Sequence, residues 1–183
     1  MNNTKLIFKH EIPIEVFAEC NTTVELLINN EICFKKEYKA NTIHKEVIEL
    51  NNEYNGSKKN TMSFLFSGER EVEKKYLKIL QVSIHKQIMN IVNAEYFPDI
   101  NQEWWEQITP SEKDGHNETI YGKTGSVFGW YGEINFYYCC GFDLRDRFRY
   151  NIENNDNTRL LDERLNWIFL DENSIKKHNT LND

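Results

Sequence analysis

Alternating apolar and polar residues dominate the first half of the chain and predict a series of short β-strands. The stretch Val24–Ile28 has an apolar side chain at every second position and ends at Asn29-Asn30. Such alternation is typical of a strand with one buried face, and adjacent Asn residues favour the turn of a two-residue hairpin. We therefore predict that the chain turns at Asn29-Asn30 and returns as a strand over Ile32–Phe34.

Further apolar runs of strand length occur at regular spacing. They cover Lys5–Phe8, Ile12–Phe17, Ile43–Leu50, Met62–Phe66 and Tyr76–Ile84. Pro13 belongs at a strand start or at a sheet edge because it has no N–H to donate. The apolar phase of the last run shifts between Ile79 and Val82, which predicts a β-bulge. Together the runs predict an all-β fold, an antiparallel, jelly-roll-like β-sandwich.

The segment Tyr121–Tyr138 places four glycines before an aromatic strand. The glycines are Gly122, Gly125, Gly129 and Gly132, and residues 133–138 alternate between two faces. A glycine-rich loop that cradles phosphate opens a helix, whereas this one opens a strand. We therefore expect no nucleotide cofactor, and we predict that Gly122, Gly129 and Gly132 shape the backbone at a sandwich corner.

The C-terminal part of the chain differs in pattern from the rest. Residues 151–157 are polar, and Thr158–Leu170 carries apolar residues at helical spacing after Asn157, a plausible helix cap. We predict a β-sandwich domain over residues 1–150 and a C-terminal extended or helical segment over 151–183. Its candidate interface residues are Leu161, Leu165, Trp167, Ile168 and Phe169. They either dock on a neighbouring protein or cover their own domain.

Length and charge limit the classes of function. A chain of 183 residues suits one domain, and the net charge of −7 weighs against nucleic-acid binding. The chain has no run of 18 apolar residues and no basic, then apolar N-terminus, so we expect no membrane span and no signal peptide. The four cysteines form no C-x-x-C pair and are expected to be free thiols.

No set of residues specifies a reaction. Glu103 and Glu106 with Asp99 resemble the carboxylate pair of a glycosidase, but their spacing in sequence favours a helix or loop edge. The five histidines are isolated from one another and from the cysteines, which favours structural or surface roles over a zinc site. We predict a protein that is not an enzyme and that holds no metal.

Aromatic residues are the remaining candidates for a binding site. They are Trp104, Trp105, Trp130, Tyr131 and Tyr137. In one interpretation their rings form an exposed platform on which sugar rings stack. In the other, about half of them line the core and the rest make subunit contacts, where Trp and Tyr are enriched. The sequence leaves both interpretations open.

One resemblance adds to this picture. Phe66-Ser67-Gly68, then Leu77–Ile84, then Tyr121–Gly125 and Gly129–Gly132 occur in an order that resembles small jelly-roll-like proteins of marine T4-like tailed phages. The resemblance covers residues 62–142. Tyr131 stands where those proteins have Asn, and Cys139-Cys140-Gly141 stands in place of Thr-Pro. The resemblance implies a sandwich similar to carbohydrate-binding modules and a component of the virion, with no catalytic residues.

These observations lead to two hypotheses about function. The first is a non-enzymatic structural or accessory protein of a phage particle, made in the host cytoplasm, which contacts other virion proteins and copies of itself. The second is a carbohydrate-binding module that recognises a host glycan. Neither hypothesis involves nucleic acid, a membrane or a cofactor.

Overall fold

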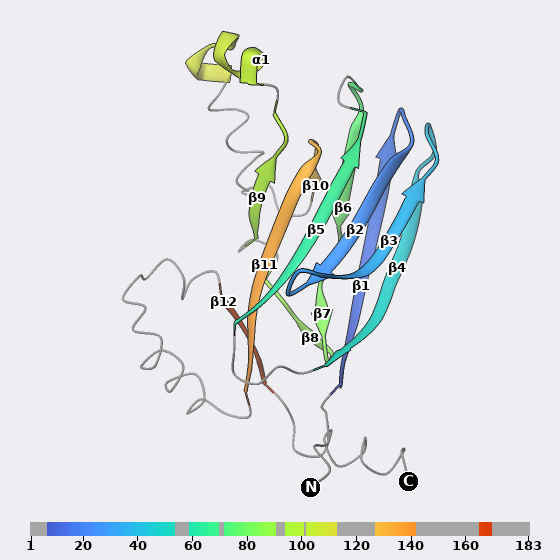
Figure 1. Ribbon diagram of the computed structural model, residues 1–183, viewed down its shortest axis with the longest axis vertical. Helices are drawn as coiled ribbons and strands as arrows, with labels where there is room; N and C mark the ends of the chain where they lie inside the picture. Colours follow the sequence, from blue (N-terminus) through green and yellow to red (C-terminus); the bar gives the residue numbers. More distant parts are fainter. Residues whose placement is uncertain are drawn as a thin grey trace, which may run out of the picture.

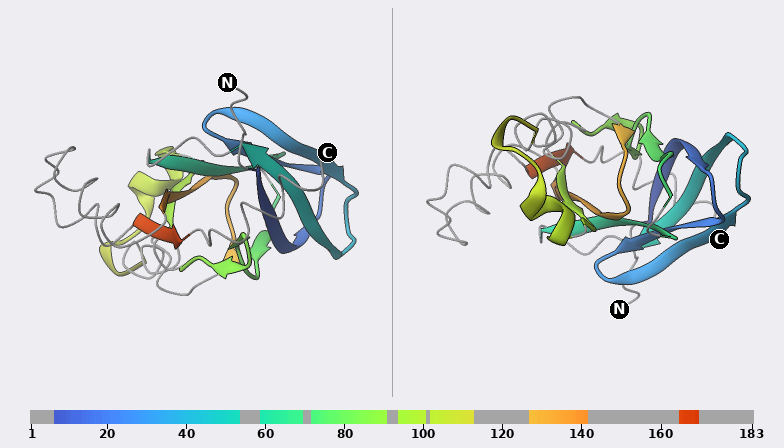
Figure 2. Two further views of the ribbon diagram at one scale, coloured as in Figure 1. Left: turned by 90° about the horizontal axis from the view of Figure 1, so that it is seen from below. Right: turned by 90° about the horizontal axis from the view of Figure 1, so that it is seen from above.

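The computed structural model describes residues 7–53, 59–69, 72–90, 94–100, 102–112, 127–141 and 165–169. These residues form two six-stranded sheets, which we call sheet A and sheet B. Figure 1 shows sheet B in front of sheet A, and Figure 2 looks along the strands from either end. The predicted all-β sandwich is confirmed.

Sheet A is built around its longest strand, β1. Its strands are β1 (Ile7–Ala18), β4 (His44–Glu53), β6 (Lys75–Ile79), β7 (Ser83–Ile84), β8 (Gln87–Ile88) and β10 (Val127–Phe128). β1 pairs with β4 along one edge and with β6 and β7 in turn along the other. β10 extends the sheet beyond β6, and β8 extends it beyond β7.

Sheet B carries the face that concerns function. Its strands are β2 (Thr22–Ile28), β3 (Glu31–Tyr38), β5 (Asn60–Gly68), β9 (Glu95–Pro98), β11 (Gly132–Gly141) and β12 (Leu165–Phe169). They follow the order β12-β11-β5-β2-β3, and β9 pairs with the first residues of β11. α1 (Gln102–Gln107) follows β9 and lies outside both sheets, at one end of the molecule in Figure 1. No described helix has the length and apolar character needed to cross a membrane.

The core lies between the sheets and consists of the inward-facing residues of each strand. In β2 the buried residues are Val24, Leu26 and Ile28, as the alternation predicts. Phe64 of β5 and Phe136 of β11 meet edge to face, with ring centroids 5.9 Å apart. Aromatic side chains bury large apolar areas, so pairs of this kind contribute strongly to the cohesion of the sandwich.

The predicted hairpin at Asn29-Asn30 is confirmed. Both residues adopt positive φ, 52° and 69°, which suits the twist of a two-residue turn between β2 and β3. The Asn29 side chain also accepts a hydrogen bond from the backbone N–H of Thr61, at 3.0 Å, and donates one to the side chain of Asn60, at 2.9 Å. The turn is therefore fixed to the start of β5.

Pro13 lies inside a strand, which corrects the prediction of two separate strands over residues 5–17. β1 runs without interruption through Pro13. The irregularity lies instead in the segment between β6 and β7, the two strands that pair with this side of β1. Two residues between Glu11 and Ile14 face three residues between Ile79 and Ser83. The Pro13 carbonyl accepts a hydrogen bond from the backbone N–H of Leu80, at 2.9 Å. The N–H and C=O of a strand residue point toward the same neighbouring strand. Pro13 therefore lacks a hydrogen-bond donor only on the side of the predicted bulge, where the ladder is already irregular.

Of the two predicted alternatives for the C-terminal segment, extended or helical, Leu165–Phe169 adopt the extended one and form strand β12, so the helical spacing is misleading there. β12 runs parallel to β11, with Ile168 opposite Cys140, and Ile168 is buried in the core. The side chain of Gln87 in β8 accepts a hydrogen bond from the Phe169 N–H at 2.9 Å and donates one to the Phe169 carbonyl. A five-residue window cannot separate a helical from a strand period, so pairing with β11 and these amide contacts decide the outcome.

β12 also changes the predicted domain boundary. A sandwich that ends at residue 150 would lack one of its strands. Of the candidate interface residues in this segment, Ile168 lies in the core of its own domain, whereas Leu165, Trp167 and Phe169 are half-buried. Leu161 lies outside the described residues.

Candidate binding site

Tyr131 does not present an exposed stacking face. Its ring is buried against Phe66, with centroids 4.7 Å apart, and its hydroxyl lies 3.2 Å from the Cys20 sulfur. The ammonium of Lys75 lies 5.1 Å from the ring centroid. Burial raises the pKa of Tyr131 to about 12. This residue therefore belongs to the core at one end of the sandwich, contrary to the platform hypothesis.

The structure describes the side chains of two of the three predicted tryptophans. Trp130 and Trp105 are half-buried and pack against the core. The backbone of Trp130 is held by Tyr96, whose hydroxyl donates to the Trp130 carbonyl at 2.6 Å. Trp104 lies in α1, and its side chain is outside the described residues.

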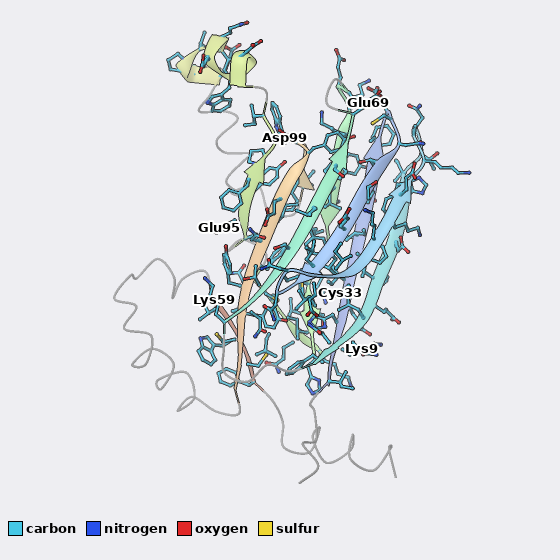
Figure 3. The ribbon with its side chains drawn as sticks, viewed as in Figure 1. Lys9, Cys33, Lys59, Glu69, Glu95 and Asp99 are labelled. Atoms are coloured by element: carbon cyan, nitrogen blue, oxygen red, sulfur yellow. The ribbon has the colours of Figure 1, made fainter. Side chains whose placement is uncertain are left out.

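Tyr137 is the predicted aromatic that faces outward from sheet B. Its hydroxyl donates a hydrogen bond of 2.6 Å to the carboxylate of Glu95, and the ammonium of Lys59 lies over its ring at 4.1 Å. Figure 3 shows Glu95 and Lys59 at the side of the sheet where β9 and β11 lie. The ring is half-buried. Since Lys59 covers one of its faces, Tyr137 is an incomplete stacking surface.

Of the three glycines predicted to shape the backbone, Gly132 is the one at which the described structure leaves no room for a Cβ. Gly132 has φ +149°, and a Cβ there would collide with the Phe97 carbonyl and lie 2.8 Å from the Pro98 Cα. At Gly129 a Cβ would meet nothing within 4 Å, and φ is not positive. The prediction is therefore wrong for Gly129, because it took the glycine spacing as a steric signal. Gly122 lies outside the described residues.

Cross-strand pairing assembles a site from residues that the sequence did not bring together, although Asp99, Tyr131 and Gly132, which line it, were already singled out. Side chains of one row across sheet B point outward together, because residues opposite one another in paired strands share a face. The row runs in the order Lys35, Glu25, Leu65, Glu133 and Phe97, from β3 through β2, β5 and β11 to β9. Phe97 is 55% exposed although it is a large apolar residue. One row thus combines an exposed ring with carboxylates.

A hollow of about 420 Å³ lies over this row, and we call it the sheet B hollow. Its lining includes Glu25, Leu65, Ser67, Phe97, Asp99 and Glu133. Asp99 follows β9 directly, and its backbone N–H donates to the Tyr131 carbonyl at 2.6 Å. This hydrogen bond holds the end of β9, and with it Phe97, beside β11. In Figure 3, Asp99 lies at the end of β9 nearest α1.

A second polar row lies next to the hollow. It contains Ser63, Asn135 and Glu95, which face one another across β5, β11 and β9. The Ser63 hydroxyl donates a short hydrogen bond of 2.5 Å to the Asn135 side-chain carbonyl, and both residues are buried. The outward face of sheet B is therefore polar beside the hollow and fixed by its own hydrogen bonds.

The carboxylates considered for catalysis are not gathered in one place. Glu103 and Glu106 are exposed on α1, whereas Asp99 lines the hollow. Within the described ranges, no group of three or more His, Cys, Asp or Glu residues has an arrangement that could hold a metal ion. Phe97, Glu25 and Glu133 were missed because the row that contains them depends on strand register.

Comparisons with known proteins found one similar structure. Neither a protein-family model nor a curated protein matches the chain. A structure described as vCBM60 in complex with galactobiose is similar, with a TM-score of 0.38 and 7% sequence identity. The similarity covers 69% of this chain and 95% of that one. A similarity of this degree does not extend to binding properties, so the site rests on its own geometry.

Proposed function

We propose that the protein is a non-enzymatic β-sandwich that binds a glycan in the sheet B hollow. The observation that carries the proposal is the exposed Phe97 ring in one row with Leu65, Glu133 and Glu25. A sugar ring has an apolar C–H face and a rim of hydroxyls. Phe97 and Leu65 offer apolar surface for the face, and the carboxylates accept hydrogen bonds from the rim.

The dimensions and composition of the hollow agree with this function. Its volume of about 420 Å³ falls within the range of small-ligand sites, roughly 300–1,000 Å³. Apolar surface with a few polar groups is the usual composition of such sites. The proposal keeps the predicted mode of binding, an aromatic ring against a sugar, but transfers it from Trp130 and Tyr131 to Phe97.

A Phe97→Ala variant tests the proposal. We expect glycan binding, found on a glycan array and measured by titration calorimetry, to weaken about tenfold, since loss of a stacked ring costs roughly 1.5 kcal/mol. Ile88→Ala is the matched control, because Ile88 is 68% exposed but lies in sheet A. Circular dichroism checks that both variants remain folded. An array without any bound glycan, or full affinity after Phe97→Ala, would contradict the proposal.

Assembly through protein contacts, as in a phage particle, is a second candidate function. Sheet A favours it with an outward apolar strip, in which Val47 lies opposite Pro13 and Leu80 binds the Pro13 carbonyl. Val47 is 54% exposed and Leu80 47%. Exposed apolar patches often mark protein interfaces. The occupant that we propose is a second copy of this chain.

Lysine substitutions on the strip test this second candidate. We expect Val47→Lys with Leu80→Lys to shift the protein from an oligomer to a monomer in light scattering, because desolvating two charges opposes association. Asn51→Lys, an exposed change on the same strand β4, is the control. A wild-type protein that is monomeric at every concentration would rule out self-association through sheet A.

A further inference from the structure

One side of strand β4 has no pairing strand among the described residues. β4 pairs with β1 over all 10 of its residues, from His44 to Glu53, without a shift of register, and no described strand pairs with its other side. Figure 1 shows β4 at the edge of the molecule, next to β3. A long, regular edge strand can pair with another chain, and proteins usually blunt such an edge with a bulge, a proline or a very short strand. β4 contains none of these three.

The free edge of β4 presents the backbone groups of Lys45, Val47 and Glu49. The Pro13 carbonyl points to Leu80, on the side of β1 away from β4. Val47 is opposite Pro13, so these two residues form a pair without mutual hydrogen bonds, and the N–H and C=O of Val47 point away from β1. The pattern repeats at every second residue, so the N–H and C=O of Lys45 and Glu49 also face the free edge.

The side chains of these three residues are complementary to a second copy of themselves. Val47 is 54% exposed, and the side chains of Lys45 and Glu49 are 75% and 61% exposed. If two copies of β4 pair antiparallel about a twofold axis through Val47, Lys45 of each copy lies opposite Glu49 of the other, and the two Val47 residues meet on the axis. Opposite charges directly across an antiparallel pair stabilise it. The charge pattern therefore identifies a second copy of the chain as the strand that fits this edge.

The same charges select one register. An axis through Lys45 would bring two ammonium groups together, and an axis through Glu49 would bring two carboxylates together, which opposes pairing. Within the chain, Lys45 lies 3.4 Å from Glu15 and Glu49 lies 3.7 Å from Lys9. Both distances exceed the length of a charge-assisted hydrogen bond, and surface ion pairs of this kind contribute little. They leave Lys45 and Glu49 able to pair across the axis.

We propose that two copies of the chain join edge to edge through β4, about a twofold axis at Val47, so that their A sheets form one continuous sheet. This inference rests on the self-association proposed as the second candidate function and specifies its geometry. The apolar strip of Leu80, Pro13 and Val47 then continues across the axis into the strip of the second copy. The outward face of sheet B takes no part in the contact, so glycan binding is tested separately.

A Val47→Pro variant tests the pairing through the edge. Proline removes the outward N–H and leaves the hydrogen bonds between β4 and β1 in place, since none of them comes from Val47. We expect the wild type to dimerise in sedimentation equilibrium and Val47→Pro to be monomeric. Val47→Ala keeps the N–H and should remain a dimer. Circular dichroism checks that both variants are folded, and a dimer that withstands Val47→Pro contradicts the proposal.

Exchange of the two charges tests the register and does not depend on the proline variant. Lys45→Glu alone, or Glu49→Lys alone, places like charges opposite each other at two symmetric positions. We expect either change to weaken the dimer about tenfold in low salt, and the double variant to regain the wild-type affinity. Lys86→Glu makes the same charge change at an exposed turn residue between β7 and β8 and should leave the affinity unchanged. If the double variant dimerises no better than the single variants, the inference is wrong.

These outcomes differ from a failure of self-association itself. A dimer that is disrupted by Val47→Lys with Leu80→Lys but withstands Val47→Pro overturns the edge geometry alone and retains association through the face of sheet A. A wild-type protein that is monomeric at every concentration overturns self-association, and the edge geometry with it. Neither result affects glycan binding in the sheet B hollow.

Discussion

Replacing Gly132 with alanine is expected to lower the free energy of unfolding by about 3 kcal/mol or more. Gly132 has φ +149°, a conformation that residues with a Cβ rarely adopt. The added Cβ would also collide with the carbonyl oxygen of Phe97 and press on the Cα of Pro98. Both are backbone atoms of β9, so no side-chain rotation relieves the contact. Chemical denaturation measures the loss.

The same substitution is expected to remove the sheet B hollow. β9 is paired with β11 through Gly132 opposite Pro98 and Glu133 opposite Phe97. A Cβ at Gly132 pushes β9 away, and Phe97 moves with it. Glycan binding should therefore be lost in any Gly132→Ala protein that still folds. Gly129→Ala is the matched control, because a Cβ there meets nothing within 4 Å. Equal stability of the two variants would contradict this account of Gly132.

Local patterns predicted the elements whose structure depends on local chemistry. The Asn29-Asn30 turn follows from the tolerance of Asn for positive φ, and the alternation in β2 places its apolar residues in the core. The shift of apolar phase after Ile79 likewise marks the bulge between β6 and β7. In each case the signal lies within a few residues, and no distant partner is needed to interpret it.

Elements that depend on distant partners escaped prediction. β12 is a strand because β11 offers an edge and Gln87 holds Phe169, neither of which is visible in its own five residues. The four residues of β9 do not indicate their pairing with β11, and Pro98, which has no N–H to donate, is tolerated at the end of this edge strand. Pairing with β11 determines both strands.

The candidate site shows the same limitation more strongly. Glu25, Leu65 and Glu133 come from three strands, and they become neighbours only through the register of β2, β5 and β11. A slip of one residue would turn each of these side chains to the other face. The sequence pattern favoured the ring of Tyr131, which is buried although it lines the hollow, over the ring of Phe97, which sheet B leaves exposed.

Acid is expected to destabilise the fold through His10. His10 is fully buried in β1, between Leu50 of β4 and Ile84 of β7, and its ring centroid is 6.3 Å from that of Tyr138. Neither ring nitrogen has a hydrogen-bond partner among the described residues. Burial lowers the pKa of His10 from 6.5 to about 4, because the charged imidazolium is poorly solvated in the core.

The direction of the effect follows from proton binding. The unfolded chain binds a proton at His10 near pH 6.5, whereas the folded protein binds it only near pH 4. The contribution of neutral His10 to stability is therefore complete above about pH 6.5 and is lost as the pH falls toward 4. The full loss corresponds to about 3 kcal/mol. Urea denaturation from pH 7 to pH 4 measures it.

A His10→Leu variant isolates this histidine from the carboxylates that titrate in the same range. Leucine fills the buried position without a titratable group, so the fall in stability between pH 7 and pH 4 should be smaller by about 3 kcal/mol. If His10→Leu and the wild type lose stability in parallel, His10 does not cause the acid sensitivity, and its charged form is accommodated in the core.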